Sequence, residues 1–265
     1  MKKSSLSVLP GGFLLLASVI LIFNFSLNSC TSKDDDLPND SIPSNEGTFT
    51  DTRDGNTYDY KTIGTQIWMT KNLAYLPSVS PNSEGSATAK YYYVFGYNGT
   101  VVADAKKTSH YTTYGVLYNW PAAMNGAASS KAVPSGVQGV CPAGWHLPSD
   151  EEWKKLEIYL GMSAGAADAT SIRDDGSVGR KLKAATGWSQ SGNGDNSSGF
   201  TALPGGIRYY NGGNLYLGLF GYFHTATTFQ ESSENLSRNM KSGSDGVVRD
   251  IDKPAGGFSV RCIHN

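Results

Sequence analysis

Apolar and polar residues alternate in short segments from about residue 48 to the end of the chain. β-Forming residues on both sides of Asp54-Gly55-Asn56 predict a hairpin over 50–60, because this triplet is a strong turn signal. A second turn and strand are predicted over 62–69, and the alternation in 257–263 predicts a final strand. The chain after Trp188 is rich in turns and β-forming residues, so the pattern indicates many short strands.

Helical spacing is clearest over 149–161. Ser149 and Glu152 have the spacing of a capping box, in which each side chain satisfies a backbone N–H of the first turn. Three apolar residues at intervals of three and four should pack inward: Trp153, Leu156 and Leu160. Shorter helices are predicted over 119–126, with Asn119 as the N-cap, and over 178–185. No internal repeat indicates a solenoid or propeller, and we predict one α+β domain over 48–265.

The first thirty residues have the pattern of an export signal. Lys2 and Lys3 precede an uncharged apolar stretch over 13–23, which is shorter than the roughly 20 residues of a spanning helix. The following Leu27-Asn28-Ser29-Cys30 resembles a bacterial lipobox, in which the Cys is acylated. We predict a lipoprotein signal peptide over 1–29 and lipid attachment at Cys30. An uncleaved anchor, or a chance Cys beside an ordinary signal peptide, are the alternatives.

Residues 30–47 are polar, acidic and Pro-bearing, and they predict a flexible tether. The run Lys33-Asp34-Asp35-Asp36 resembles the surface-export signal of Bacteroidota lipoproteins, although a solvated spacer has the same composition. Asp40-Ser41-Ile42 resembles an O-glycosylation acceptor of that phylum, with Ser41 as the acceptor. These features predict an outer-membrane lipoprotein, anchored through Cys30 and exposed at the cell surface.

Charge and composition argue against a nucleic-acid-binding protein. The chain has 265 residues, 22 basic and 23 acidic, for a formal net charge of −1. The segment 30–47 has five acids and one base, whereas the part from 48 onwards has 19 bases and 18 acids. A near-neutral domain with 17% charged residues gives no electrostatic basis for binding nucleic acid.

Several motifs, taken together and in order, resemble one family. They are Asp54-Gly55-Asn56-x-Tyr58, Ile63-Gly64-x-Gln66-x-Trp68-Met69-x-x-Asn72-Leu73, Tyr114-Gly115-x-Leu117-Tyr118-Asn119-Trp120, Cys141-Pro142-x-Gly144-Trp145-His146-Leu147-Pro148-Ser149-x-x-Glu152-Trp153 and Gly257-Phe258-Ser259-Val260-Arg261-Cys262. The resemblance is to the Fibrobacter succinogenes major paralogous domain (FISUMP) and covers about 52–264. It implies a secreted or surface protein of Bacteroidota or Fibrobacterota, and it implies no defined activity.

A more distant similarity concerns the fold. The segment from Trp145 to Trp153 and the terminal Gly-Phe-x-Val-Arg are similar to the formylglycine-generating-enzyme family, which has a C-type-lectin-like fold. This similarity implies a C-type-lectin-like α+β domain whose termini meet in one small sheet, below a long loop region. The copper-binding Cys pair of those enzymes and the calcium signatures of sugar-binding C-type lectins have no counterpart here. Catalysis and calcium-dependent sugar binding are therefore not implied.

The chain has three Cys, and two remain once Cys30 is assigned to the lipid. In a protein exported to an oxidising compartment, Cys141 and Cys262 are predicted to form a disulfide. A Cys nucleophile is the alternative, and it would require a nearby base.

Metal and cofactor chemistry find no support in the sequence. The four His do not have metal-ligand spacing, and we expect His146 to be a hydrogen-bonded structural residue. The sequence lacks a nucleophile elbow and a phosphate-binding Gly loop. We therefore predict no catalytic residues, no metal and no cofactor.

The segment 186–224 carries the candidate ligand-binding residues, because aromatic rings stack on sugars and short polar side chains bind hydroxyls. These candidates are Trp188, Asn193, Asp195, Asn196, Arg208, Tyr209, Tyr210, Asn211 and Tyr216. The alternative is that most of these aromatics belong to the core. We predict a non-catalytic binding domain for a glycan, a peptide or an envelope protein. A structural or tip subunit of a surface assembly is the main alternative, and a formylglycine-enzyme-like catalyst is a weaker one.

Overall fold

The computed structural model describes residues 45–230 and 232–265, which lie within one compact unit. The predicted signal peptide, Cys30, Ser41 and most of the predicted tether lie outside the described residues. The first strand includes Glu46 and Gly47, so the folded domain begins two residues before the predicted boundary at 48.

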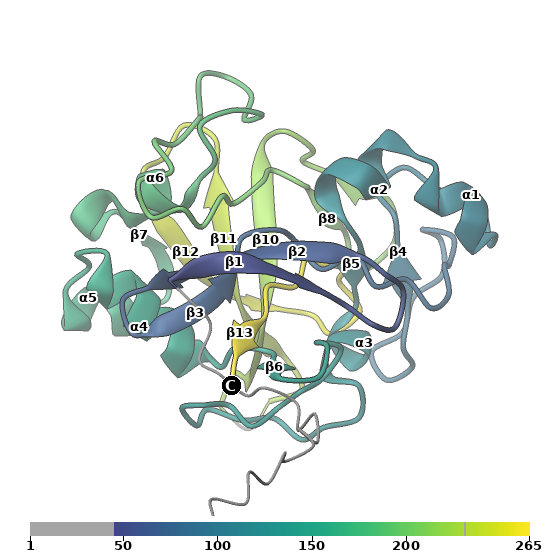
Figure 1. The fold of residues 1–265 in the computed structure, drawn as a ribbon, viewed down its shortest axis with the longest axis horizontal. Coiled ribbons are helices and arrows are strands. Elements are labelled where there is room, and N and C mark those ends of the chain that lie inside the picture. The colour runs from purple at the N-terminus through teal and green to yellow at the C-terminus, as the bar shows by residue number, and fades with distance from the viewer. Residues whose placement is uncertain (1–44, 231) are drawn as a thin grey trace, which may run out of the picture. The chain divides into compact units, whose positions relative to one another are not determined.

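Short strands and short helices alternate along the domain, which confirms the predicted α+β class (Figure 1). The strands are β1 (Glu46–Thr50), β2 (Thr57–Ile63), β3 (Gln66–Met69), β4 (Tyr92–Tyr93), β5 (Leu117–Tyr118), β6 (Trp145–His146), β7 (Ser171–Arg173), β8 (Ile207–Arg208), β9 (Asn214–Leu215), β10 (Phe220–Thr228), β11 (Asn235–Lys241), β12 (Val247–Asp252) and β13 (Ile263–His264). The helices are α1 (Val102–Lys106), α2 (Ser109–Tyr114), α3 (Trp120–Met124), α4 (Asp150–Tyr159), α5 (Ala164–Asp168) and α6 (Val178–Leu182), with a 3₁₀ turn over Asp175–Ser177.

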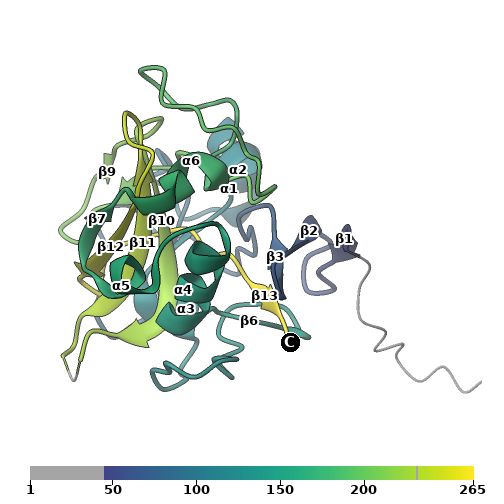
Figure 2. The ribbon, with the colours of Figure 1, turned by 90° about the vertical axis from the view of Figure 1, so that its left-hand side faces the viewer.

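Two sheets organise these elements. The first has the order β1-β2-β3-β13-β6, so the last strand of the domain lies between strands from its beginning and its middle. The second has the order β10-β11-β12-β7, and β4-β5 and β8-β9 form two separate two-stranded sheets. Helix α4 lies between the two large sheets (Figure 2). Trp153 of α4 contacts Trp68 of β3 on one side, at 4.9 Å between ring centroids, and Phe223 of β10 on the other, at 5.8 Å.

The hairpin predicted over 50–60 is confirmed. β1 pairs antiparallel with β2, and Gly55 in the connecting turn has a φ of +77°, a conformation that favours glycine. The predicted final strand is only partly regular. Ile263 pairs with Trp68 and His146, whereas Gly257, Phe258 and Ser259 form single bridges to three different segments, because this stretch passes between the sheets instead of joining one.

The helix predicted over 149–161 is observed as α4, with the expected capping box. The Ser149 hydroxyl accepts the Glu152 backbone N–H at 3.2 Å, and the Glu152 carboxylate accepts the Ser149 N–H at 2.9 Å. The same carboxylate lies 2.8 Å from Nε2 of His146, whose Nδ1 lies 2.7 Å from Asn265 Oδ1. His146 is therefore a buried, hydrogen-bonded residue, as predicted. Trp153 and Leu156 are fully buried, while Leu160 is half-buried.

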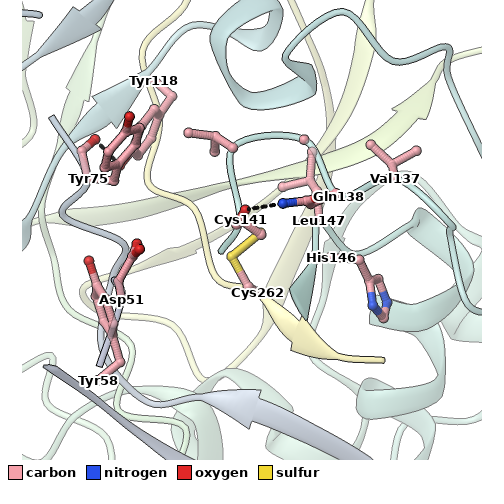
Figure 3. Close-up of a disulfide and its surroundings, with 12 residues drawn as sticks. Asp51, Tyr58, Tyr75, Tyr118, Val137, Gln138, Cys141, His146, Leu147 and Cys262 are labelled. Atoms are coloured by element: carbon pink, nitrogen blue, oxygen red, sulfur yellow. Dashed lines mark hydrogen bonds between the residues drawn. A yellow bond between two sulfur atoms is a disulfide. The ribbon is translucent and has the colours of Figure 1, made fainter. Parts of the chain in front are cut away.

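The predicted disulfide between Cys141 and Cys262 is present (Figure 3). It joins the loop before β6 to the residue before β13, with 6.0 Å between the two Cα atoms. Both sulfurs are fully buried with the core residues around Leu147. Neither residue has a free thiol, so the alternative of a Cys nucleophile is excluded for this pair.

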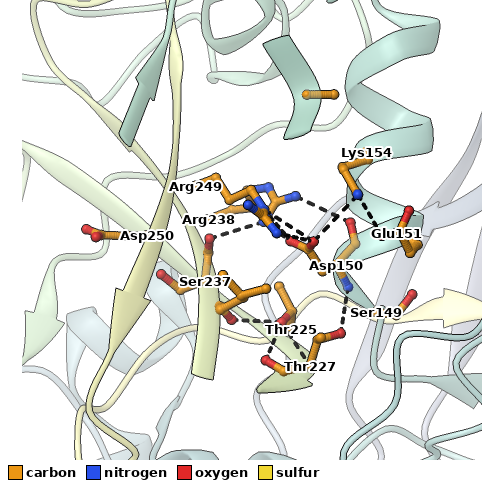
Figure 4. Close-up of polar contacts among 12 residues, drawn as sticks. Ser149, Asp150, Glu151, Lys154, Thr225, Thr227, Ser237, Arg238, Arg249 and Asp250 are labelled. Carbon is orange, nitrogen blue, oxygen red and sulfur yellow. Dashed lines mark hydrogen bonds and ion pairs between the residues drawn. The ribbon is translucent and has the colours of Figure 1, made fainter. Parts of the chain in front are cut away.

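A buried network of ion pairs fixes α4 to the second sheet (Figure 4). Arg238 of β11 is fully buried and bridges two carboxylates of α4, with 2.7 Å to Asp150 and 2.7 Å to Glu157. Arg249 contacts Asp150 at 2.8 Å, and Arg173 contacts Glu157 at 2.7 Å. Burial alone would raise the pKa of Asp150, but the two arginines outweigh it and hold the pKa well below its usual range. The network is a structural element with every charge paired.

Arg261, from the terminal motif, is fully buried and has no carboxylate partner among the described residues. Its guanidinium donates to the side-chain oxygen of Asn72 at 2.7 Å and to the backbone oxygens of Met69, Phe200 and Thr201. Burial lowers the pKa of Arg261 to about 9. This one side chain therefore joins the terminal segment to two others, at 69–72 and 200–201.

Candidate functional site

The structure divides the nine predicted ligand-binding residues into three groups. Trp188 belongs to the core, with 5% exposure, and its indole N–H donates to Ala202 O at 3.1 Å. Arg208 is 1% exposed, and its guanidinium donates to backbone oxygens of Asn82 and Ala255. Both predictions are corrected, because neither side chain is available to a ligand. The composition of the segment could not distinguish them from surface residues.

The second group stabilises its own loop. Asn193 accepts the Trp188 backbone N–H at 2.9 Å, and Asp195 forms an ion pair with Arg180 at 3.2 Å. Asn196 bonds both the N–H and the hydroxyl of Thr201. These short polar side chains therefore replace regular backbone pairing in the loop, and the structure does not place them beside the tyrosines of the third group.

The third group is exposed around the β8–β9 pair. Tyr209, Tyr210 and Asn211 form the turn between the two strands, and Tyr216 follows β9. Tyr210 and Tyr216 are each 45% exposed. The rings of Tyr209 and Tyr210 lie 4.5 Å apart, and Tyr216 contacts Phe220 of β10 at 5.0 Å. These residues remain candidates for ligand contact.

A surface pocket of about 480 Å³ lies against Tyr210. We refer to it as the Trp120–Tyr210 pocket, and its walls include Thr88, Trp120, Tyr210, Thr228, Lys253 and Pro254. Trp120 is the first residue of α3, where the side chain of Asn119 caps the helix. Its backbone N–H donates to Pro254 O at 2.9 Å and its indole N–H to Thr225 O at 3.0 Å, so the ring is held rigidly.

Trp120, Lys253 and Pro254 are not among the residues predicted to bind a ligand. Trp120 does pack against the core, yet it is only half-buried and its ring also lines the pocket. The spacing in 119–126 could show one buried face of a short helix, but not the surface that the remaining part of the indole would meet. The contact between α3 and the segment at Pro254 joins residues more than 130 positions apart, which no local signal reveals.

Two other hollows are more polar. One of about 430 Å³ is lined by hydroxyl and amide groups, including those of Asn56, Tyr58 and Asn72. Another of about 540 Å³ opens beside the ion-pair network, where Asp150 and Arg249 already satisfy each other. The Trp120–Tyr210 pocket differs from both because an indole and an exposed phenol ring line it together.

No group of three or more His, Cys, Asp or Glu within 45–230 and 232–265 could hold a metal ion. His224 is fully buried, donates from Nε2 to Tyr118 O at 2.7 Å and stacks on Phe258. Burial lowers the pKa of His224 to about 4, so the imidazole is neutral at physiological pH.

Asp252, at the end of β12, has a raised pKa, in contrast to Asp150 of the ion-pair network. Burial raises the pKa of Asp252 to about 6, and the charges of Asp250 and Glu234 act in the same direction. A hydrogen bond from the Ser237 hydroxyl, at 2.6 Å, opposes the shift. A carboxyl group whose pKa is higher in the folded than in the unfolded state destabilises the fold once it ionises.

We therefore expect Asp252→Asn to stabilise the protein at pH 7.5 by about 1–3 kcal/mol, the cost of ionising this carboxyl. The gain should shrink as the pH falls through about 6, because native Asp252 then becomes neutral as well. Urea unfolding at pH 7.5 and at pH 5 measures both values. Asp59→Asn, at an exposed ion pair with Lys71, is the control and should change stability by less than about 1 kcal/mol. A gain for Asp252→Asn that is equal at both pH values would contradict the assignment.

Comparison with known proteins assigns the domain to a family. The family model of the Fibrobacter succinogenes major domain matches residues 62–264. No curated protein and no solved structure matches the chain. Within the part of the chain that the structure describes, no helix is long and apolar enough to cross a membrane. The matched range includes α3, the β8–β9 pair and Pro254, and so contains the whole Trp120–Tyr210 pocket.

Proposed function

The chain belongs to the Fibrobacter succinogenes major domain family, and from this premise we propose that it is a surface-anchored lipoprotein whose folded domain binds a ligand without catalysis. The observation that carries the proposal is the Trp120–Tyr210 pocket, where two aromatic rings and several hydroxyl groups line one hollow. The ligand classes are a glycan, a peptide or another envelope protein, and the lining favours a glycan.

The chemistry of the lining supports this preference. A sugar ring presents C–H groups on its faces and hydroxyls at its edge, so it requires flat apolar surfaces beside hydrogen-bonding groups. Trp120 and Tyr210 supply the flat surfaces, and Thr88 and Thr228 supply hydroxyls. Lys253 forms an ion pair with Glu234, so the pocket does not present an unpaired lysine. A volume of about 480 Å³ is within the usual range of small-molecule sites.

The proposed fold is C-type-lectin-like, and the arrangement of the ends of the domain supports it. β13 pairs with β3 and β6, so the terminal strands meet in one sheet, and long loops connect the remaining elements. This likeness concerns architecture only. A formylglycine-enzyme-like activity finds no support in the two Cys of the domain, since both are in the disulfide.

The proposed surface location depends on lipidation at Cys30. We expect Cys30→Ser to leave the protein in the soluble fraction after cell lysis, because several acyl chains anchor a protein firmly and none would then be attached. Fractionation of the wild type and the variant, followed by protease treatment of intact cells, measures anchoring and exposure together. A Cys30→Ser protein that still sediments with membranes would refute the lipid anchor.

Removal of the exposed Tyr210 ring should weaken glycan binding. The test uses the chain from residue 31, which retains every described element, and a glycan array to select the tightest glycan. We expect Tyr210→Ala to raise the Kd for that glycan at least about tenfold, which corresponds to about 1.4 kcal/mol of lost contact. Tyr159→Ala removes an exposed ring on α4, 64% accessible and outside the pocket lining, and should leave the Kd unchanged.

The outcomes of this binding test also distinguish a glycan-binding domain from a structural subunit of a surface assembly. Equal affinity of the Tyr210→Ala and Tyr159→Ala variants would exclude this pocket as the site. No glycan on the array, together with a stoichiometric envelope protein in a pull-down from the surface fraction, would favour a structural subunit instead.

A further inference from the structure

The face of the second sheet opposite α4 carries two carboxylates without an ion-pair partner. Side chains alternate along a strand, so Arg238 faces α4 and its neighbour Ser237 faces away (Figure 4). Asp250 lies opposite Ser237 in the register, and Asp252 lies opposite Asn235. Within the described part of the chain, neither Asp250 nor Asp252 lies within ion-pair distance of a Lys, Arg or His.

The neighbouring cations are already engaged. Lys253, next in sequence, pairs with Glu234, and Arg249 faces α4 and pairs with Asp150. Lys241 lies at the far end of β11, opposite Phe220 and away from Asn235. The two carboxylates therefore give this face two negative charges at neutral pH.

Aromatic rings flank these carboxylates. Tyr222 of β10 stacks on Phe220, with ring centroids 5.7 Å apart, and contacts Phe258 at 5.3 Å. Tyr222 lies opposite Asn239 in the register, so its side chain is on the same face as Ser237 and Asp250. The two carboxylates thus share one face of the sheet with the Tyr222 ring.

The face that carries the two carboxylates also has a buried side-chain amide without a hydrogen-bond partner. Asn235 is fully buried, and among the described residues neither its Oδ1 nor its Nδ2 has a hydrogen-bond partner. Residues paired across adjacent strands direct their side chains to the same face, so the amide of Asn235 is on the side of the Asp252 carboxylate. A buried amide without a partner costs free energy, and a ligand with hydroxyl or amine groups would satisfy it.

We propose that this face binds the protonated amine of an amino sugar, with the ammonium between Asp250 and Asp252 and the sugar ring against Tyr222. The inference rests on the proposed glycan-binding function and extends its site, since Asp252 directly precedes Lys253, which lines the Trp120–Tyr210 pocket. Carboxylates bind an ammonium through charge-assisted hydrogen bonds, and the face of an aromatic ring attracts a cation. A lysine side chain carries the same charge but has no flat ring to cover Tyr222.

The test compares two saccharides that differ in charge. The probes are a β-1,4-linked glucosamine tetramer and its N-acetylated counterpart, titrated calorimetrically into the chain from residue 31 at about pH 6.5 and low salt, where the amines and the carboxylates carry charge. We expect the glucosamine tetramer to bind at least about tenfold more tightly, through the two carboxylates. The double variant Asp250→Asn and Asp252→Asn should reduce this preference to less than about twofold.

The controls keep the inference separate from the proposed function. Asp104→Asn, at an exposed pair with Lys107, should leave the preference intact, and thermal unfolding checks that each variant is folded. Equal binding of both tetramers to the wild type would overturn this inference and leave glycan binding in place. Failure of both to bind would overturn it as well, and glycan binding would then rest on the array alone. A lysine tetramer that binds as tightly as the glucosamine tetramer, and equally depends on the carboxylates, would overturn the sugar assignment.

Discussion

Replacement of both Cys141 and Cys262 by Ser is expected to lower the free energy of unfolding by about 4–5 kcal/mol. The bridge joins residues 121 positions apart, so its loss restores a large amount of conformational freedom to the unfolded chain. Chemical denaturation of the oxidised wild type and of the double variant measures the difference. A reduced wild type, kept in dithiothreitol, should match the variant.

A small loss would contradict this account of the disulfide. If the variant loses less than about 1 kcal/mol, the core around Leu147 must hold the loop before β6 and the end of the chain together without the bridge. Near-complete unfolding at 37 °C would agree with the expectation, because a loss of this size is a large fraction of the stability of a domain.

Arg238→Met is expected to cost about 3–5 kcal/mol, because it leaves two buried carboxylates with one fewer cation. Arg238 is the only residue of the network that contacts both Asp150 and Glu157. After its removal Arg249 still pairs with Asp150 and Arg173 with Glu157, but the bond between the helix and the central strand is lost. Urea unfolding of the variant, compared with the wild type at pH 7, gives the value.

Arg249→Met is the matched control. Its side chain is 12% exposed and contacts only one of the two carboxylates, so water can partly replace it. We expect it to cost less than half as much as Arg238→Met. Equal losses would show that the network stabilises the fold through its total charge and not through the bridge at Arg238.

The sequence was sufficient to predict features that depend only on residues close together in the chain. The Asp54-Gly55-Asn56 turn, the capping box at Ser149 and the Asn119 cap all depend on residues within four positions of one another, and each was found where predicted. The disulfide followed from the count of Cys once Cys30 was assigned to the lipid. Helices α1, α2 and α5 were not predicted, whereas α3, which is as short, was predicted from its Asn119 cap.

The candidate site was only partly predictable. Tyr210 and Tyr216 are exposed, as a binding role requires, and Tyr209 is half-buried, but Arg208 beside them is held by backbone oxygens in the interior. Whether a residue in a Gly-rich segment faces solvent depends on distant segments, in this case the chain at Asn82 and Ala255. The pocket likewise joins α3 to the turn between β8 and β9 and to the chain at Pro254, which only the folded chain brings together.

The central claim is that a ligand occupies the Trp120–Tyr210 pocket, and the indole signals of the protein test it most directly. The chain has five Trp, of which Trp68, Trp145, Trp153 and Trp188 are at most 5% exposed and only Trp120 lines the pocket. In a ¹⁵N–¹H correlation spectrum, addition of the tightest glycan from the array should shift the Trp120 indole signal and leave the other four in place. A glycan that binds without moving the Trp120 signal would contradict the account.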